Sequence, residues 1–346
     1  MLRLIWMTSL VLAAVAVLTV LLLVVGRVVG GWTAKRYQRR RAMLVTKILS
    51  SLEETSPTQE LLDLLRRHRS MATGVFTEIF ELVRGLDQQR LAALAETSGI
   101  PQHLQSMLRQ GSVPARLQAA ETLVWFPSRE SRAVLFEALS DRNDDVSLAA
   151  ATCLADWHIE IPIAQLLEAR KDRIGRSSLR LEALLARIAP RQTDDVLKIV
   201  ADLAKPERVR VAAIDALARA KSFDLVGPLC TYASDPTAAV RAAVARGLGI
   251  LGHPAAEGAV ASLLGDSDWQ VRADAAEAAG RISLVSLVEA LSDLLADDNW
   301  LVRFRAGEAL AVLGPEGLAS LRRLVLSQAD VPRRMAGLIL AERGLA

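Results

Sequence analysis

The chain repeats itself with a period of about 31 residues over most of its length, and this period constrains the fold more than any other feature. Eight positions mark the repeat, each in a helix-forming stretch, and all but one of the steps between them are identical. A fixed period of this length predicts stacked units of two helices, each too small to bury its own apolar face. The marked positions are Arg116, Ser147, Ser178, Arg210, Arg241, Arg272, Arg303 and Arg334.

Apolar residues recur at fixed places around each marked position. Around Arg272 they are Val271, Ala275, Ala278 and Ile282, a spacing that traces one stripe of an α-helix. A second apolar segment lies between successive marked positions, and no stretch alternates with a period of two for long enough to suggest a strand. We therefore expect an all-α chain with two antiparallel helices per unit.

The amino-acid sequence of the repeat also resembles that of a known family. The strings "DSDWQVRADAAEA", "DDNWLVRFRAGEA" and "DPTAAVRAAVARGLG" resemble the short HEAT repeat, a variant first noted in phycobilisome lyases and common in bacterial proteins. The resemblance is strongest over residues 205–314. It implies an armadillo-type right-handed α-α superhelix, with about eight repeats over residues 111–346. Residues 53–110 lack the marked positions and are expected to form irregular helices that cap this solenoid.

An aspartate stands six residues before several of the marked arginines. These acids could form a ladder of catalytic or metal-binding carboxylates. Alternatively, each could close the turn, cap the next helix and face the arginine of its own or an adjacent unit. Recurrence favours the structural interpretation, because an active site needs one constellation and not a copy in every unit. The predicted structural ladder comprises Asp235, Arg241, Asp266, Arg272, Asp297 and Arg303.

Positions two, five and nine residues after a marked arginine fall off the apolar stripe. In HEAT proteins these helices line the concave face, so we expect a partner to bind there. The charges alternate in sign, which suits a protein surface better than a polyanion. Two tryptophans, three residues before their arginines, either anchor the partner or pack the turn between repeats. The candidate partner-binding residues are Asp274, Glu277, Arg281, Arg305, Glu308, Trp269 and Trp300.

The N-terminus holds an uninterrupted run of uncharged residues, 4–26. As a helix they would be about 34 Å long, enough to cross a hydrocarbon core of about 30 Å. The stretch is too long for the apolar core of a signal peptide, and only Arg3 precedes it, so we expect an uncleaved transmembrane helix within residues 4–31. Basic residues in the juxtamembrane segment 32–52 predict that the remainder is cytoplasmic, and they could also attract anionic lipids. They are Lys35, Arg36, Arg39, Arg40 and Arg41.

Charge and motifs narrow the function. The net charge of +3 arises from residues 1–41, which hold seven basic and no acidic residues. The rest has 35 basic against 39 acidic residues, a net charge of −4 that argues against nucleic-acid binding. No phosphate-binding loop, G-x-S-x-G, H-E-x-x-H or C-x-x-C occurs, and the four histidines have no metal-ligand spacing. We expect no catalysis, no cofactor and no bound metal.

The sequence thus predicts a bacterial inner-membrane protein with a single membrane span. Its cytoplasmic HEAT solenoid would be a scaffold for one or more protein partners, themselves membrane-associated. Two alternatives remain open. The solenoid could be a regulatory or assembly subunit of a membrane enzyme, such as a glycosyltransferase system for envelope polysaccharide, or a chromophore chaperone similar to the bilin lyases.

Overall fold

The computed structural model describes residues 36–52, 57–168 and 178–344, and every regular element within these ranges is a helix. The predicted all-α class is confirmed for this part of the chain. The predicted membrane span at residues 4–31, and Lys35 after it, lie outside the described residues. None of the described helices is both long enough and apolar enough to cross a membrane.

The helices group into two compact units that divide after Ser131. In the first unit, the rings of Phe80 and Trp125 stack with their centroids 5.2 Å apart, and Phe126 meets Phe80 edge-on at 5.5 Å. This aromatic cluster forms one part of its core. A helix over residues 36–52 comes first. It is followed by α2 (Gln59–Arg67), α3 (Arg69–Leu82), α4 (Leu86–Ser98), α5 (Ile100–Gln110), α6 (Val113–Thr122), η1 (Leu123–Trp125) and the start of α7 (Arg129–Ala138).

The helix over residues 36–52 carries the predicted membrane-proximal basic residues. Arg36, Arg39 and Arg40 are exposed. Arg41 forms an ion pair with Glu78 of α3, which holds this end of the helix against the unit. The helix is therefore amphipathic, with a basic surface at its start and one buried apolar side. That side comprises Leu44, Ile48 and Leu52.

The second unit begins within α7 and contains the regular repeats. Its elements are α8 (Asp144–Asp156), α9 (Ile163–Glu168), α10 (Ser178–Ile188), α11 (Thr193–Ala201), α12 (Glu207–Arg219), η3 (Phe223–Leu225), α13 (Val226–Cys230), η4 (Thr231–Ser234), α14 (Ala238–Leu251), η5 (Pro254–Ala256), α15 (Glu257–Leu264), α16 (Trp269–Ile282), η6 (Val285–Leu287), α17 (Val288–Asp293), η7 (Leu294–Ala296), α18 (Trp300–Val312), α19 (Gly314–Val325) and α20 (Asp330–Glu342).

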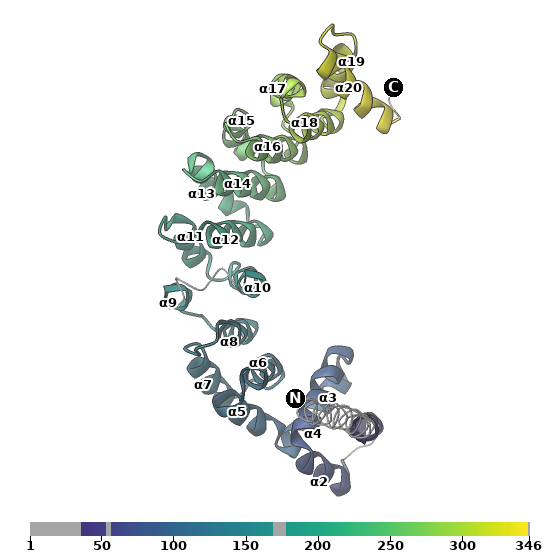
Figure 1. Cartoon of the computed structure of the whole chain (residues 1–346), viewed down its shortest axis with the longest axis vertical. Coiled ribbons are helices and arrows are strands. Elements are labelled where there is room, and N and C mark those ends of the chain that lie inside the picture. The colour runs from purple at the N-terminus through teal and green to yellow at the C-terminus, as the bar shows by residue number, and fades with distance from the viewer. Residues whose placement is uncertain (1–35, 53–56, 169–177, 345–346) are drawn as a thin grey trace, which may run out of the picture. The chain divides into compact units, whose positions relative to one another are not determined.

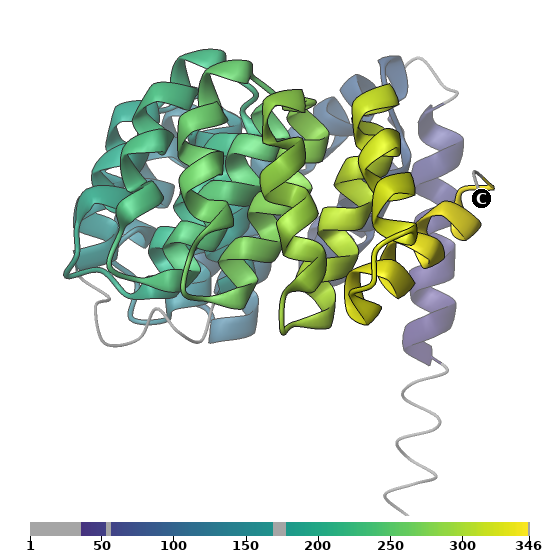
Figure 2. The ribbon, with the colours of Figure 1, turned by 90° about the horizontal axis from the view of Figure 1, so that it is seen from above.

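The second unit has two layers of helices (Figure 1). Helices α8, α10, α12, α14, α16 and α18 form an inner layer on its concave side, and α7, α9, α11, α13, α15 and α17 form an outer layer. Figure 2 shows the helices of this unit standing side by side. From Ser147 onward, every marked position of the sequence repeat lies in an inner-layer helix or in α20, which packs against α18. The expectation that these helices line the concave face is confirmed.

Small residues set the spacing of the inner layer. A Cβ atom added at Gly249 would lie 3.0 Å from Cα of Ala278, and one added at Gly280 would lie 3.0 Å from Cα of Ala309. No side chain fits in that space without moving a neighbour. Glycine at these positions, facing alanine on the next helix, thus allows close contact between successive inner helices.

Candidate functional site

The marked arginines bind aspartates of the following repeat. Arg241 donates from Nε and Nη2 to the two carboxylate oxygens of Asp266, at 2.7 and 2.8 Å. Arg272 binds Asp297 in the same way, at 2.7 and 3.0 Å. Arg210 forms the equivalent buried pair with Asp235. We call these three pairs the Arg–Asp ladder. Each pair links one helix hairpin to the next, because its aspartate belongs to the turn that opens the following unit.

The predicted role of the aspartates as helix caps is wrong. Asp266 accepts a hydrogen bond from the N–H of Asp268 at 2.9 Å, so it does close the turn. The cap of α16 is Asp268, which accepts hydrogen bonds from the N–H groups of Gln270 and Val271. The arginine six residues later, Arg272, reaches only the main-chain oxygen of Asp266, at 2.8 Å. The two functions are divided because Asp266 lies too far before the helix to cap it.

The ladder shifts the titration of its carboxyl groups. Hydrogen bonds from Arg241, and from the N–H of Asp268, hold the pKa of Asp266 below its ordinary value. Burial alone would raise the pKa of Asp297. The hydrogen bonds that Arg272 and the N–H of Asn299 donate outweigh burial, so its pKa is lowered as well, and the same balance lowers that of Asp235. The ladder is therefore fully ionised at neutral pH.

The ladder ends at Arg303. This residue donates from Nη1 to the main-chain oxygens of Asp297 and Asp298, at 2.6 and 2.9 Å, as Arg272 does one repeat earlier. The place that a ladder aspartate would take after Arg303 is occupied by Gln328. Among the described residues, no carboxylate forms an ion pair with Arg303, in contrast to the three arginines before it.

A second set of charges connects the inner helices on their concave side. Arg246 on α14 lies 2.7 Å from Asp274 on α16 and 3.7 Å from Asp215 on α12. Asp274 also contacts Arg305 on α18. Arg305 lies 3.2 Å from Glu277. We call this chain of ion pairs, which reaches Arg281 through Glu277, the charge network. It joins four successive inner helices.

Asp274 is not a surface residue. Sequence spacing placed it off the apolar stripe and among the partner-binding candidates, but it is only 4% exposed. Arg246 and Arg305 enclose its carboxylate from the helices on either side. The prediction that Asp274 offers its charge to a partner is therefore wrong, because neighbouring helices supply both the cover and the counter-ions.

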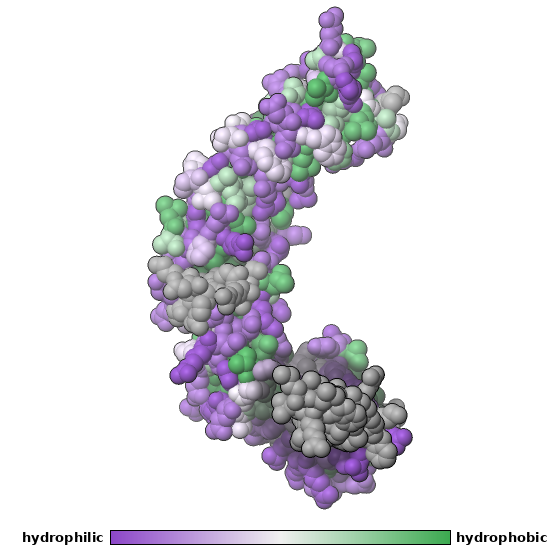
Figure 3. Space-filling view, in the orientation of Figure 1, coloured by the Kyte–Doolittle hydropathy of each residue, from purple (hydrophilic) through white to green (hydrophobic). Residues whose placement is uncertain are grey.

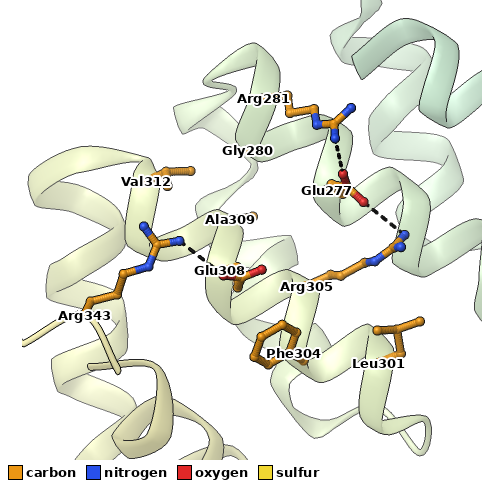
Figure 4. Close-up of a pocket in the computed structure, with 10 residues that line it drawn as sticks. All are labelled: Glu277, Gly280, Arg281, Leu301, Phe304, Arg305, Glu308, Ala309, Val312 and Arg343. Atoms are coloured by element: carbon orange, nitrogen blue, oxygen red, sulfur yellow. Dashed lines mark hydrogen bonds and ion pairs between the residues drawn. The ribbon is translucent and has the colours of Figure 1, made fainter. Parts of the chain in front are cut away.

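The other charged candidates do come together, in a groove of about 590 Å³ where α16, α18 and the end of α20 meet (Figure 4). Glu277 lies 2.6 Å from Arg281 and 3.2 Å from Arg305, and Glu308 lies 3.2 Å from Arg343. Gly280 and Ala309 leave space between the two ion-pair clusters. The remaining lining residues are apolar, namely Leu301, Phe304 and Val312. The sequence analysis did not name Phe304 or Arg343. Phe304 directly follows a marked arginine, whereas Arg343 lies nine residues after Arg334, the same offset that Arg281 has from Arg272.

Both tryptophans remain accessible. Trp269 is 43% exposed and Trp300 is 54% exposed, at the first positions of α16 and α18. Trp300 stacks on Phe304, with ring centroids 5.1 Å apart and an angle of 12° between the planes. This pair makes an aromatic platform, of which Phe304 lines the groove and Trp300 lies beside it. The exposure favours the partner-anchor interpretation over tight packing of the turn.

The face of the second unit seen in Figure 3 is mixed in polarity. Figure 3 shows hydrophilic atoms over most of the visible face of the second unit, with hydrophobic atoms in several smaller areas, one of them near α18 and α20. In the groove, Arg281, Arg305 and Arg343 lie beside Glu277 and Glu308, and Arg305 also contacts the buried Asp274, which it shares with Arg246. The lining residues thus carry three positive and two negative charges, so the groove has no large excess of either sign.

The described residues offer no metal site and no activated thiol. Among them, no three His, Cys, Asp or Glu side chains lie close enough to hold a metal ion. Cys153 is buried, and both desolvation and Asp156 raise the pKa of its thiol far above the usual range. Cys230 is partly buried, and its pKa is also raised by desolvation. Neither thiol has the lowered pKa of a reactive cysteine.

Comparison with known proteins identifies the repeats. The family model described as HEAT repeats matches residues 193–260 and 256–341. Residues 193–341 therefore contain HEAT repeats, and this region covers the Arg–Asp ladder, the charge network and every residue that lines the groove except Arg343. No curated protein sequence matches the chain.

Several solved structures are similar in their chain path. YibA of Escherichia coli has 17% sequence identity and a TM-score of 0.41, covering 71% of this chain and 92% of its own. Human deoxyhypusine hydroxylase in complex with glycerol has 20% identity and a TM-score of 0.31, covering 80% and 97%. Kap121p has 12% identity and a TM-score of 0.48, covering 86% and 43%, so this chain spans less than half of Kap121p.

Proposed function

We propose that this HEAT-repeat solenoid is a scaffold that binds a segment of a protein partner in the groove formed by α16, α18 and the end of α20. The supporting observation is the groove itself. Its apolar surface, formed by Leu301, Phe304 and Val312, lies between two ion-pair clusters, and the exposed Trp300 extends it at one end. Exposed aromatic side chains with a polar rim are typical of protein-binding surfaces.

The paired charges in the groove indicate which class of partner it can bind. A nucleic acid or another polyanion needs a surface with excess positive charge. In this groove Glu277 and Glu308 are paired with Arg281, Arg305 and Arg343, so a polyanion gains little from it. A protein segment with an apolar side and charges of both signs fits the same surface.

A membrane tether belongs to the same proposal. Residues 4–31 are proposed to cross the inner membrane of a bacterium once, with the solenoid on the cytoplasmic side, and the supporting feature is the run of basic residues after the span. Confinement to the membrane raises the effective concentration of the solenoid near a membrane-associated partner. We further propose that the protein acts by binding and not by catalysis, because its sequence carries no catalytic motif.

The test is partner capture from membrane extracts with a matched pair of variants. Phe304→Ala removes the aromatic wall of the groove. Phe223→Ala removes a side chain of the same kind that is 62% exposed on η3, away from the groove. Truncation of an interface anchor typically weakens binding by about 2 kcal/mol or more, roughly thirtyfold. We expect only Phe304→Ala to lose the partner.

The outcome also decides among functions. Equal capture by both variants and the native chain would exclude the groove as the binding site. Crosslinking in intact membranes followed by mass spectrometry then identifies the client. Recovery of one integral membrane enzyme favours a regulatory subunit, several soluble proteins favour a general scaffold, and a bound pigment favours a chromophore chaperone.

A further inference from the structure

The end of the Arg–Asp ladder leaves one arginine with unused donors. In Arg241 and Arg272, Nη1 binds main-chain oxygens of the preceding turn, while Nε and Nη2 bind the next aspartate. Arg303 repeats the first half of this arrangement, since its Nη1 binds the oxygens of Asp297 and Asp298. Its Nε and Nη2 donate to no described residue.

Substitution in the next repeat explains the unused donors. The ladder position that follows Arg303 is Gln328, which is exposed and forms no hydrogen bond with Arg303. The nearest acid in that turn, Asp330, forms ion pairs with Arg333 and Arg334 on its own helix. Within the described part of the chain, no carboxylate therefore replaces the missing one.

The unused donors are already oriented for a carboxylate. Two main-chain hydrogen bonds fix one end of the guanidinium group, so binding at the other end loses little side-chain freedom. Its counterparts in the chain bind carboxylates through the same two nitrogens, at 2.7 and 2.8 Å in Arg241 and at 2.7 and 3.0 Å in Arg272. Those internal aspartates show what ligand this arrangement takes.

We infer that Arg303 binds an acidic side chain of the protein partner, which completes the ladder from outside the chain. The inference rests on the proposed function and narrows the partner's chemistry. Trp300 precedes Arg303 by one helical turn and stacks on Phe304. The partner segment therefore carries an aspartate or glutamate next to an apolar side chain, with the carboxylate on Arg303 and the apolar group on the aromatic platform.

The direct test uses a carbodiimide, which joins a lysine amine to a carboxylate in contact with it. Arg303→Lys keeps the positive charge and supplies the amine. Treated in intact membranes, the full-length variant should form an amide bond between position 303 and an aspartate or glutamate of another protein, detected by mass spectrometry. Arg272→Lys is the positive control, because its amine should join Asp297 of the same chain.

A second variant places a carboxylate of the same chain at the ladder position that follows Arg303. Gln328→Asp restores the ladder position, so it should raise the melting temperature and displace the partner's acid. A bidentate arginine–carboxylate pair is among the stronger polar contacts, and we expect capture of the partner to fall about tenfold. Combined with Arg303→Lys, Gln328→Asp should also abolish the bond to the other protein.

The outcomes separate the two proposals. A bond from position 303 only to peptides of this chain, or no bond at all, would overturn the inference. Unchanged capture by Gln328→Asp would overturn it too. If Phe304→Ala still loses the partner in that case, the groove remains the binding site and only the carboxylate contact fails. If Phe304→Ala also retains the partner, the proposed function fails with it.

Discussion

Arg272 and Asp297 belong to successive helix hairpins and share two hydrogen bonds, of 2.7 and 3.0 Å, between Nε and Nη2 and the two carboxylate oxygens. A third bond, from Nη1 of the same arginine to the main-chain oxygen of Asp266, fastens the guanidinium group to its own turn. One side chain thus holds two turns together. The stability of each hairpin therefore depends on its neighbour, as nearest-neighbour coupling in repeat proteins requires.

The direction of pairing predicts an asymmetric double-mutant cycle. Arg241→Ala and Asp266→Ala should each lower the free energy of unfolding by about 2 kcal/mol, because each leaves a partly buried charge without its partner. The coupling energy between these two changes should be about 1–2 kcal/mol. Coupling between Arg272→Ala and Asp266→Ala should be much smaller. Urea denaturation gives all the values, and equal coupling in both cycles would contradict the pairing.

Removal of the central acid of the charge network should destabilise the inner layer. Asp274→Asn leaves Arg246 and Arg305 without their shared carboxylate, and we expect a loss of about 2–3 kcal/mol in the free energy of unfolding. Glu277→Gln is the control, since Glu277 is more exposed and its pairs are worth about 1 kcal/mol or less. Similar losses for the two variants in chemical denaturation would mean that burial of Asp274 adds nothing.

Acid should weaken the fold through the ladder. The pKa values of Asp235, Asp266 and Asp297 are lowered in the folded state. Their contribution is therefore present above the unfolded value, about 3.9, and is lost as the pH falls through the depressed folded values. As the pH falls below about 4, the free energy of unfolding of Asp266→Asn should therefore decrease less steeply than that of the native chain. Thermal melts across that range measure it, and an unchanged slope would argue against the ladder.

Contact between α16 and α18 predicts a glycine-specific effect. Gly280→Ala places a Cβ atom 3.0 Å from Cα of Ala309, so the helices must move apart at a cost of about 1–3 kcal/mol. Gly258→Ala in α15 meets nothing within 4 Å and should be neutral or stabilising by up to about 1 kcal/mol. The melting temperatures of the two variants should therefore shift in opposite directions or by clearly different amounts.

The proposed topology can be checked independently of the fold. A reporter fused after Ala346 should fluoresce in the cytoplasm if the basic residues after residues 4–31 stay inside. Alkaline phosphatase fused at the same point should then be inactive. An active phosphatase fusion without fluorescence would place the solenoid on the other side of the membrane.

Sequence periodicity was sufficient for the elements of the repeat, because burial against a neighbour imposes the same spacing on each unit. It located the marked position of every inner helix, but it did not single out Gly249 and Gly280, which lie eight residues after a marked arginine and off the predicted apolar stripe. It could not settle which arginine an aspartate binds. Asp266 is much nearer in sequence to Arg272 than to Arg241, and only the stacking of hairpins brings the distant side chain closer.

Helical spacing could not predict which of the charged candidate residues are exposed. A helical stripe describes one helix, so it assigned Asp274 and Glu277 to the same surface. Adjacent helices bury Asp274 beneath Arg246 and Arg305 while Glu277 stays in the groove. The end of the Arg–Asp ladder at Arg303 can nevertheless be recognised in the sequence. The same step along the chain from successive arginines meets Asp235, Asp266 and Asp297, and then Gln328.

Because every ladder bond reaches one hairpin forward, the Arg–Asp ladder can change length without a new kind of bond. A second copy of residues 269–299, inserted after the first, would bring its own Arg272 and Asp297 and find the same glycine–alanine contact on both sides. No ladder bond would be broken, and Arg303 would keep its place at the end, but Asp274 of the first copy would face Asp274 of the second instead of Arg305. Tandem duplication of one repeat would therefore extend the Arg–Asp ladder, lengthen the concave surface and move the terminal arginine farther from the N-terminal end, while the charge network would need an arginine in place of the second Asp274.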